Sequence, residues 1–254
     1  MLLGFAEDYQ WIFVNAKHEL VLTRANTDLN AIIQAPADTN VKIALIKIEW
    51  IIPSITVSDM KEVNLLNYIA KDPVITLSFR SWELYEYPFL LRTMKHVWVV
   101  KTSTQLKKRR YVILAFQTAR KNDATKDTSK FVHCNLRDVK LFLNSQSYPY
   151  GNINLDITHN QYALLYDMYK DFQVSYYGKE AKPLLSKKQF LDTSLLIVID
   201  CSEQNGSFKS GPVDVRLEFK STKQFLANTS AYCLIIHDRI IEYKSLSGQV
   251  RKLM

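Results

Sequence analysis

Apolar and polar residues alternate one by one along short runs of this chain, and this pattern restricts the fold more than any other feature. Between Val213 and Phe219 every second residue is apolar, and charged residues fill the positions between them. Because successive side chains of a β-strand point to opposite faces, such a run predicts a strand with one buried face and one solvated face. Together with short continuous apolar runs, the pattern predicts strands at 18–24, 41–52, 75–80, 96–102, 110–118, 138–144, 195–199, 213–220 and 231–243.

Two segments break the alternation and predict helices. Ser58 is a suitable N-cap for a short helix, which Pro73 would stop. Its apolar residues share one face and are Met60, Val63, Leu66 and Ile69.

A longer helix is predicted to end at Gly178. Thr158 and Gln161 have the spacing of a capping box at its start, and Asn160 is a rival N-cap. Aromatic and apolar residues recur at intervals of three and four along it, as expected of a face that packs on a core. These residues are Tyr162, Leu165, Tyr166, Tyr169, Phe172 and Tyr176.

Long strand-rich stretches with two inserted helices predict a mainly β fold. The sequence shows no βαβ alternation and no repeat at a fixed period. About ten strands joined by long, mixed connections are typical of a sandwich or jelly roll. The fold class is therefore all-β, with a jelly-roll sandwich as the expected architecture.

The chain is basic, with 33 Lys and Arg against 25 Asp and Glu and a formal charge of +8. Such an excess favours polyanions and acidic surfaces. One tight cluster is formed by Lys107, Lys108, Arg109 and Arg110, and a looser group by Arg120, Lys121, Lys126 and Lys130. Both flank one predicted strand, so solvated loop ends are the preferred interpretation and weak nucleic-acid contact is the alternative.

The cysteines and the N-terminus bear on the compartment. Cys134, Cys201 and Cys233 are an odd number, are widely spaced and form no CxxC pair, so buried thiols are expected in place of disulfides or a zinc site. The first residues lack a basic region and reach Glu7 and Asp8 early, so no secretory signal peptide is recognised. We expect a protein that is intracellular when synthesised and inserts into no membrane.

No catalytic arrangement is found in the sequence. The GxSxG, GxxxxGK[ST], GxGxxG and HExxH motifs are missing, and His133 and Cys134 would point to opposite faces of a strand. Asn152, Asn154 and Asp156 begin like a calcium loop, but the required glycine and distal glutamate are missing. We therefore predict no enzymatic activity, no catalytic residue, no cofactor and no metal site.

Tyrosines before the long predicted helix and at its end are candidates for a ligand or interface role. Exposed aromatic side chains often mark surfaces that bind carbohydrate or protein. The four candidates are Tyr148, Tyr150, Tyr176 and Tyr177.

Several segments in order along the chain resemble one family. They are LLGFAEDYQWIFVNAKHELVLTR, KIEWIIPSI, RRYVILAFQT, VKLFLNSQSYPYGNINL, LLIVIDCSEQNGSFKSGPVDVRLEF and AYCLIIHDRIIEY. They are similar to segments of double jelly-roll-like domain proteins, which are encoded in insect and other invertebrate genomes. Those proteins in turn resemble major capsid proteins of the adenovirus and Polinton lineage.

The resemblance implies a structural role. Proteins of this type place two eight-stranded sandwiches side by side, and three chains form a capsomer; none of their residues is catalytic or binds a cofactor. The implied function is that of a capsid-like protein of viral or endogenous viral origin, which self-assembles as a homotrimer and resides in a virion if it is viral. The alternative is a jelly-roll binding module for a carbohydrate or protein partner.

The resemblance also implies a division of the chain. Residues 1–53 would be the closing strands of a first, N-terminally truncated jelly roll. Residues 54–71 would form a linker helix, and residues 72–254 a second, complete jelly roll.

Overall fold

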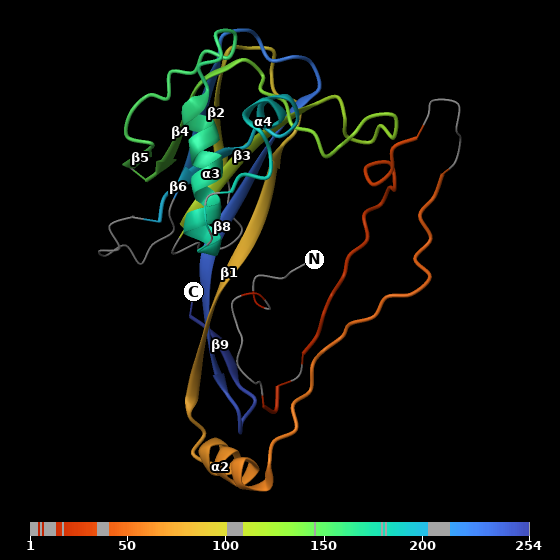
Figure 1. Ribbon diagram of the computed structural model, residues 1–254, viewed down its shortest axis with the longest axis vertical. Helices are drawn as coiled ribbons and strands as arrows, with labels where there is room; N and C mark the ends of the chain where they lie inside the picture. The colour runs from red at the N-terminus through yellow and green to blue at the C-terminus, as the bar shows by residue number, and fades with distance from the viewer. Residues whose placement is uncertain are drawn as a thin grey trace. The chain divides into compact units, whose positions relative to one another are not determined.

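Strands dominate the structure, a computed structural model that describes residues 5, 7, 14–16, 18–34, 41–100, 109–144, 146–178, 180, 182–202 and 214–253. The helices named in Figure 1 are α2 (Asp59–Ile69), α3 (Ala163–Tyr177) and α4 (Lys187–Thr193). The strands are β1 (Val74–Tyr87), β2 (Lys95–Val100), β3 (Arg109–Thr118), β4 (Leu136–Leu143), β5 (Gln146–Tyr148), β6 (Ile197–Asp200), β7 (Val215–Ser221), β8 (Thr229–Lys244) and β9 (Val250–Lys252).

The strands form two sheets whose order identifies the topology. One sheet has the order β1-β8-β3-β6, with β9 paired to β8, and the other has the order β2-β7-β4-β5. First and last strands pair, then second and seventh, third and sixth, fourth and fifth, and successive pairs fall in alternate sheets. An eight-stranded hairpin wound in this way is a jelly roll. The predicted all-β jelly-roll fold is confirmed.

By their internal packing the residues divide into two compact units. One comprises residues 29–38 and 82–237, and the other comprises 1–28, 39–81 and 238–254. In the latter, Asn15 Nδ2 donates to the Ser245 carbonyl over 2.9 Å, and the Leu246 amide donates to Asp72 over 3.2 Å. The domain boundaries inferred from the family resemblance, at residues 53 and 71, remain a prediction.

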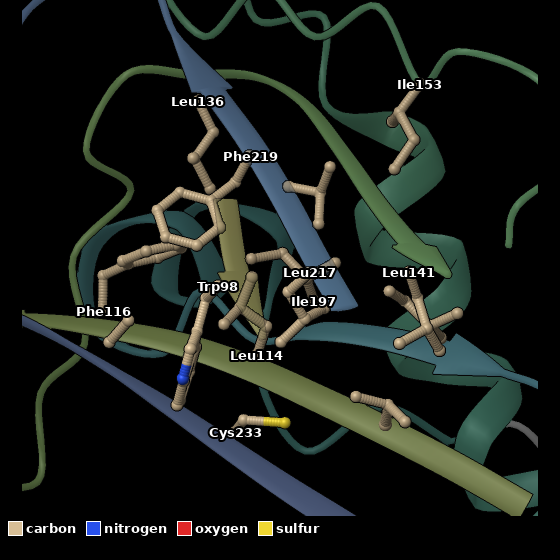
Figure 2. Packing of buried hydrophobic residues seen from close by; sticks show 14 of the residues in the cluster. Trp98, Leu114, Phe116, Leu136, Leu141, Ile153, Ile197, Leu217, Phe219 and Cys233 are labelled. Atoms are coloured by element: carbon tan, nitrogen blue, oxygen red, sulfur yellow. The ribbon is translucent and has the colours of Figure 1, made fainter. Parts of the chain in front are cut away.

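The core of the 82–237 unit lies between the inner faces of the sheets. In β7, Val215, Leu217 and Phe219 are fully buried, whereas Arg216 and Lys220, at alternate positions, are exposed. Figure 2 shows Leu217 and Phe219 beside Phe116 and Leu114 of β3. The alternation in the sequence is therefore the alternation between this core and solvent.

Helix α3 uses its aromatic stripe as predicted. Tyr162 and Leu165 belong to the main core, while Phe172 and Tyr176 pack on Tyr111 of β3 in a second, smaller cluster. The ring centroids of Tyr111 and Phe172 are 5.0 Å apart. Because Tyr111 points opposite to the core residue Val112, this end of α3 covers the outer face of the sheet that contains β3 and β6.

The predicted start of α3 is wrong. The N-cap position is Tyr162, which makes no side-chain capping bond. Thr158 instead donates to Asp156 over 2.6 Å, and Asn160 has a left-handed φ of 58° inside a tight turn. Local side-chain bonds of this kind compete with helix capping. The predicted end is confirmed, since Gly178 adopts a φ of 62° there.

Helix α2 occurs where it was predicted, with a different environment for its apolar face. The Ser58 carbonyl accepts from the Glu62 amide over 2.9 Å, but the Ser58 side chain makes no capping bond. Ile69 is buried, whereas Met60, Val63 and Leu66 are exposed. The predicted apolar face exists, and most of it contacts solvent.

Strands predicted at 18–24 and 41–52 are not formed. The described residues of both segments belong to no strand. A strand requires a hydrogen-bonded neighbour, and the described part of the chain supplies none to either segment.

Helix α4 was missed from the sequence although its start has a clear signature. Ser186 Oγ accepts from the Gln189 amide over 3.3 Å, and Gln189 Oε1 accepts from the Ser186 amide over 3.0 Å. This reciprocal pair is a capping box. Beyond it, the helix buries Phe190 completely.

Replacing Ser186 with alanine is expected to lower the free energy of unfolding by about 1 kcal/mol, because a helix donor loses its acceptor. Urea denaturation followed by circular dichroism measures the change. Ser247→Ala, at an exposed turn residue, is the control and should change stability by less than about 0.5 kcal/mol. Equal effects of the two substitutions would contradict the capping role.

Candidate functional site

The structure describes two of the four residues in the tight basic cluster, Arg109 and Arg110. Arg109 is buried with 2% of its surface exposed, and burial lowers its pKa; Arg110 is exposed. Lys107 and Lys108 lie outside the described residues. Nucleic-acid contact by this cluster remains a prediction, with Arg110 the member that the structure places at the surface.

The three lysines of the second basic group are paired with acidic neighbours. Lys121 Nζ lies 2.6 Å from Glu86 Oε2, Lys126 Nζ lies 3.1 Å from Asp123 Oδ2, and Lys130 Nζ lies 3.6 Å from Asp127 Oδ2. These pairs neutralise much of the local charge. The solvated-loop interpretation therefore describes this group well.

The four candidate tyrosines differ in exposure. Tyr148 and Tyr176 are buried, and the Tyr176 hydroxyl accepts from Trp82 Nε1 over 3.2 Å. Tyr150 is 83% exposed and Tyr177 is about half exposed. A ligand or interface role for the four remains a prediction, and only Tyr150 and Tyr177 present much of their rings to solvent.

A pocket lies beside two of these tyrosines. It has a volume of about 310 Å³ and is lined by Pro149, between Tyr148 and Tyr150, and by Phe172 and Ser175 of α3. Its other walls include Asp171 and Asp200. The pocket lies against the edge strand β6, and nothing in its lining resembles a reactive centre.

The cysteines have the chemistry of buried thiols. Burial raises the pKa of Cys134 to about 12, and burial followed by proximity to Cys201 raises the pKa of Cys233 to about 12. A thiol with such a pKa forms almost no thiolate at neutral pH and is a poor nucleophile. His133 Nδ1 accepts from the Asn135 amide over 3.0 Å. The His133–Cys134 pair is therefore not arranged as an activated nucleophile.

The described part of the chain contains neither a cluster of metal ligands nor a helix that could span a membrane. No group of three or more His, Cys, Asp or Glu side chains there could hold a metal ion. None of its helices combines the length and the apolar character that crossing a bilayer demands.

Residues 41–55 form an exposed apolar segment, which we call the apolar segment. Ile46 is 98% exposed and Ile51 is 87% exposed. The other exposed apolar side chains are Val41, Leu45, Ile48, Trp50, Ile52 and Ile55. Large exposed apolar side chains gathered along one segment in this way are typical of an interaction site.

The backbone of the apolar segment has one anchor. Arg24 Nη2 donates to the Ile43 carbonyl over 2.6 Å, and the Ile43 amide donates to Asp28 Oδ2 over 3.0 Å. Hydrogen bonds from Arg24, and then from the Ile43 amide, lower the pKa of Asp28. Beyond Ile43, residues 44–57 make no backbone hydrogen bond to any described residue.

One set of cations could not be found from sequence spacing. Lys95, Arg137 and Lys220 line a second pocket, of about 370 Å³. They are separated by many residues in the chain and no motif links them. Only the pairing of β2, β7 and β4 brings them to one place.

Strand order and core packing define this protein as a jelly-roll protein. The double jelly roll-like domain family matches residues 1–241, and the chain belongs to that family. The resemblance noted in the sequence is therefore confirmed. A search of curated proteins found no match.

Three solved structures share weak similarity with the chain. A chain of the Sputnik virophage is 12% identical with a TM-score of 0.42, and the match covers 71% of this chain and 39% of the Sputnik chain. The mavirus major capsid protein is 9% identical with a TM-score of 0.36, and the match covers 70% of this chain and 41% of the mavirus protein. The major capsid protein P2 of bacteriophage PM2 is 11% identical with a TM-score of 0.29, and the match covers 70% of this chain and 46% of P2. The chain thus spans less than half the length of each.

Proposed function

We propose that this chain is a non-enzymatic structural protein that acts by self-association, as a capsid-like building block. The exposed apolar segment is the observation that supports the proposal most directly. Most of its apolar side chains are exposed, and the backbone of residues 44–57 makes no hydrogen bond to a described residue. Partner strands would cover the side chains and satisfy the backbone at once. Membership of the double jelly roll-like family gives the proposal its context.

The side chains supply the driving force for association. Ile46 and Ile51 are almost fully exposed. Transferring one such side chain from water to an apolar contact contributes about 1.5–3 kcal/mol. Several of them covered together would offset the entropy lost when copies associate.

The backbone supplies the direction of association. Residues 44–57 offer N–H and C=O groups that no described residue satisfies. Exposed extended backbone of this kind is a template for strand addition. We propose that residues 1–53 act as closing strands of a first jelly roll, with 54–71 as a linker helix and 72–254 as a second jelly roll.

The assembled product is proposed to be a homotrimer. Identical subunits in closed assemblies are related by rotational symmetry, and a trimer uses one repeated interface. If the gene is viral, the trimer would be a unit of the virion shell. No catalytic residue and no cofactor enters this proposal.

Replacing Ile46 and Ile51 with aspartate is expected to abolish association, because two charged carboxylates would then lie in the surface that must be buried when copies associate. Size-exclusion chromatography with light scattering measures the molar mass. The unchanged chain should rise above its monomer mass of 29.5 kDa toward three times that value as concentration increases, while the double variant stays near 29.5 kDa.

Leu184→Asp is the matched control for that experiment. Leu184 is 85% exposed and lies outside the apolar segment, so this variant should associate like the unchanged chain. Circular dichroism checks that each variant is folded, which is expected because the replaced side chains are exposed. Full association of the double variant, or its loss in Leu184→Asp alone, would count against the proposal.

A further inference from the structure

We propose that the pocket lined by Lys95, Arg137 and Lys220 binds a phosphate group. This inference does not rest on the apolar segment or on self-association. It rests on the way three neighbouring strands bring three cations to one pocket that holds a single carboxylate, with which none of the three forms an ion pair among the described residues.

Strand pairing builds the pocket. Lys95 of β2 lies directly opposite Lys220 of β7, and Lys220 lies opposite Asp138 of β4. The register of β4 shifts between Leu136 and Asp138, which is where Arg137 stands. Asn152 and Asn154, from the segment after β5, complete the polar wall.

The placement of the two lysines is unfavourable without a ligand. Like charges directly opposite each other on paired strands repel and destabilise the sheet. Local choices that oppose the fold are expected at functional sites. An anion held between Lys95 and Lys220 would turn the repulsion into attraction.

The pocket cations are unpaired within the described part of the chain. Lys95, Arg137 and Lys220 are exposed and form no ion pair or side-chain hydrogen bond with a described residue. The buried Asp138 accepts from the Ile153 amide over 3.1 Å. Three cations against this single carboxylate leave the pocket a net charge of +2 (3 − 1). By contrast, the ammonium groups of Lys121, Lys126 and Lys130 each form an ion pair with a carboxylate.

The donors match the chemistry of phosphate. A guanidinium offers a planar fork for two oxygens, and ammonium groups add point charges around the others. The Asn152 and Asn154 amides can donate further hydrogen bonds. A volume of about 370 Å³ accommodates a phosphate with part of what it is attached to. The source is either a free phosphate compound or the phosphodiester of a single-stranded nucleic acid.

A charge-matched pair of triple variants of the full chain tests the proposal. The pocket variant is Lys95→Gln, Arg137→Gln and Lys220→Gln. The control variant is Lys121→Gln, Lys126→Gln and Lys130→Gln, which removes the same charge from ion-paired residues. Binding of pyrophosphate is measured by calorimetry, and binding of a fluorescent oligothymidylate by anisotropy. A short poly-glutamate peptide with the same net charge as pyrophosphate serves as the anion that contains no phosphate.

The pocket variant is expected to weaken phosphate binding at least about tenfold, and the control variant by less than about threefold. If the oligonucleotide binds, its logarithmic salt slope should fall by about 2 in the pocket variant, since each phosphate contact on a single strand contributes about 0.7. Pyrophosphate binding alone identifies a free phosphate compound as the source. Binding of both identifies a phosphodiester as an additional ligand.

Three results would overturn the inference. They are no binding of either phosphate probe, equal weakening by the two triple variants, and binding of poly-glutamate as tightly as pyrophosphate. Circular dichroism controls for folding, and Arg137→Gln alone provides a second variant that removes only the forked donor. That single variant should weaken binding about threefold or more, and unchanged binding would contradict the role of Arg137.

Discussion

Replacing Phe219 with alanine is expected to lower the free energy of unfolding by about 3–5 kcal/mol. The side chain is completely buried in the sandwich core. Its ring centroid lies 5.0 Å from that of Phe116, 5.4 Å from that of His96 and 5.7 Å from that of Phe225. Removing the ring leaves a cavity that rigid neighbours from both sheets cannot fill, as the packing in Figure 2 indicates.

Urea denaturation followed by fluorescence or circular dichroism measures this loss. A fall of about 3–5 kcal/mol is a large fraction of the roughly 5–15 kcal/mol that stabilises a typical domain. Phe89→Ala is the matched control, because Phe89 is 70% exposed, and its cost should stay below about 0.5 kcal/mol. Similar costs for the two substitutions would mean that Phe219 does not lie in the core described here.

Above pH 9 the buried Cys233 is expected to make the protein less stable as pH rises. Its thiol has an ordinary pKa of 9.0, which burial, followed by proximity to Cys201, raises to about 12 in the folded state. Between these values the unfolded chain releases the proton and the folded chain keeps it. The unfolded state therefore binds fewer protons, and the free energy of unfolding falls with pH. Below pH 9 both states keep the proton and the group has no effect.

Comparison with Cys233→Ala isolates the contribution of this thiol. The slope approaches about 1.4 kcal/mol per pH unit, so the unchanged chain should lose about 2 kcal/mol more than the variant between pH 8 and pH 10.5. Urea denaturation at several pH values gives both curves. Groups that titrate in this range and do not interact with Cys233 act on both proteins alike. Parallel curves would contradict the buried, neutral thiol.

Most of the sandwich could be predicted because its strands alternate between core and solvent. The run around Leu217 and Phe219 became β7, and the runs at 96–102, 110–118 and 138–144 became β2, β3 and β4 within a few residues. In each case one face is buried between sheets, so period-2 patterning follows from the fold. The aromatic stripe of α3 was predictable for the same reason with a helical period.

The secondary-structure predictions failed where a local sequence pattern forms its element only if it finds hydrogen-bonding partners elsewhere in the chain. Residues 18–24 and 41–52 have strand-like composition, but pairing is a non-local property and no described residue pairs with them. The spacing of Thr158 and Gln161 predicts a capping box, but the Thr158 hydroxyl is bound to Asp156, and the capping box that forms is at Ser186. A four-residue motif identifies a helix start only when its side chains are not bound elsewhere.

Clusters of basic residues in the sequence did not identify which cations are exposed and unpaired in the described structure. Arg109 is buried, and Lys121, Lys126 and Lys130 are paired with acidic residues. Lys95, Arg137 and Lys220 never approach one another in the sequence and meet only through strand pairing. A charge cluster that depends on register could be predicted only after the order of β2, β7 and β4 was known.

Sedimentation of the unchanged chain over a concentration series tests most directly whether this protein acts by self-association. Self-association predicts a weight-average mass that increases with concentration from 29.5 kDa toward that of a trimer. A mass that stays at 29.5 kDa up to high concentration, for this chain and for any longer product that contains it, would rule out self-association.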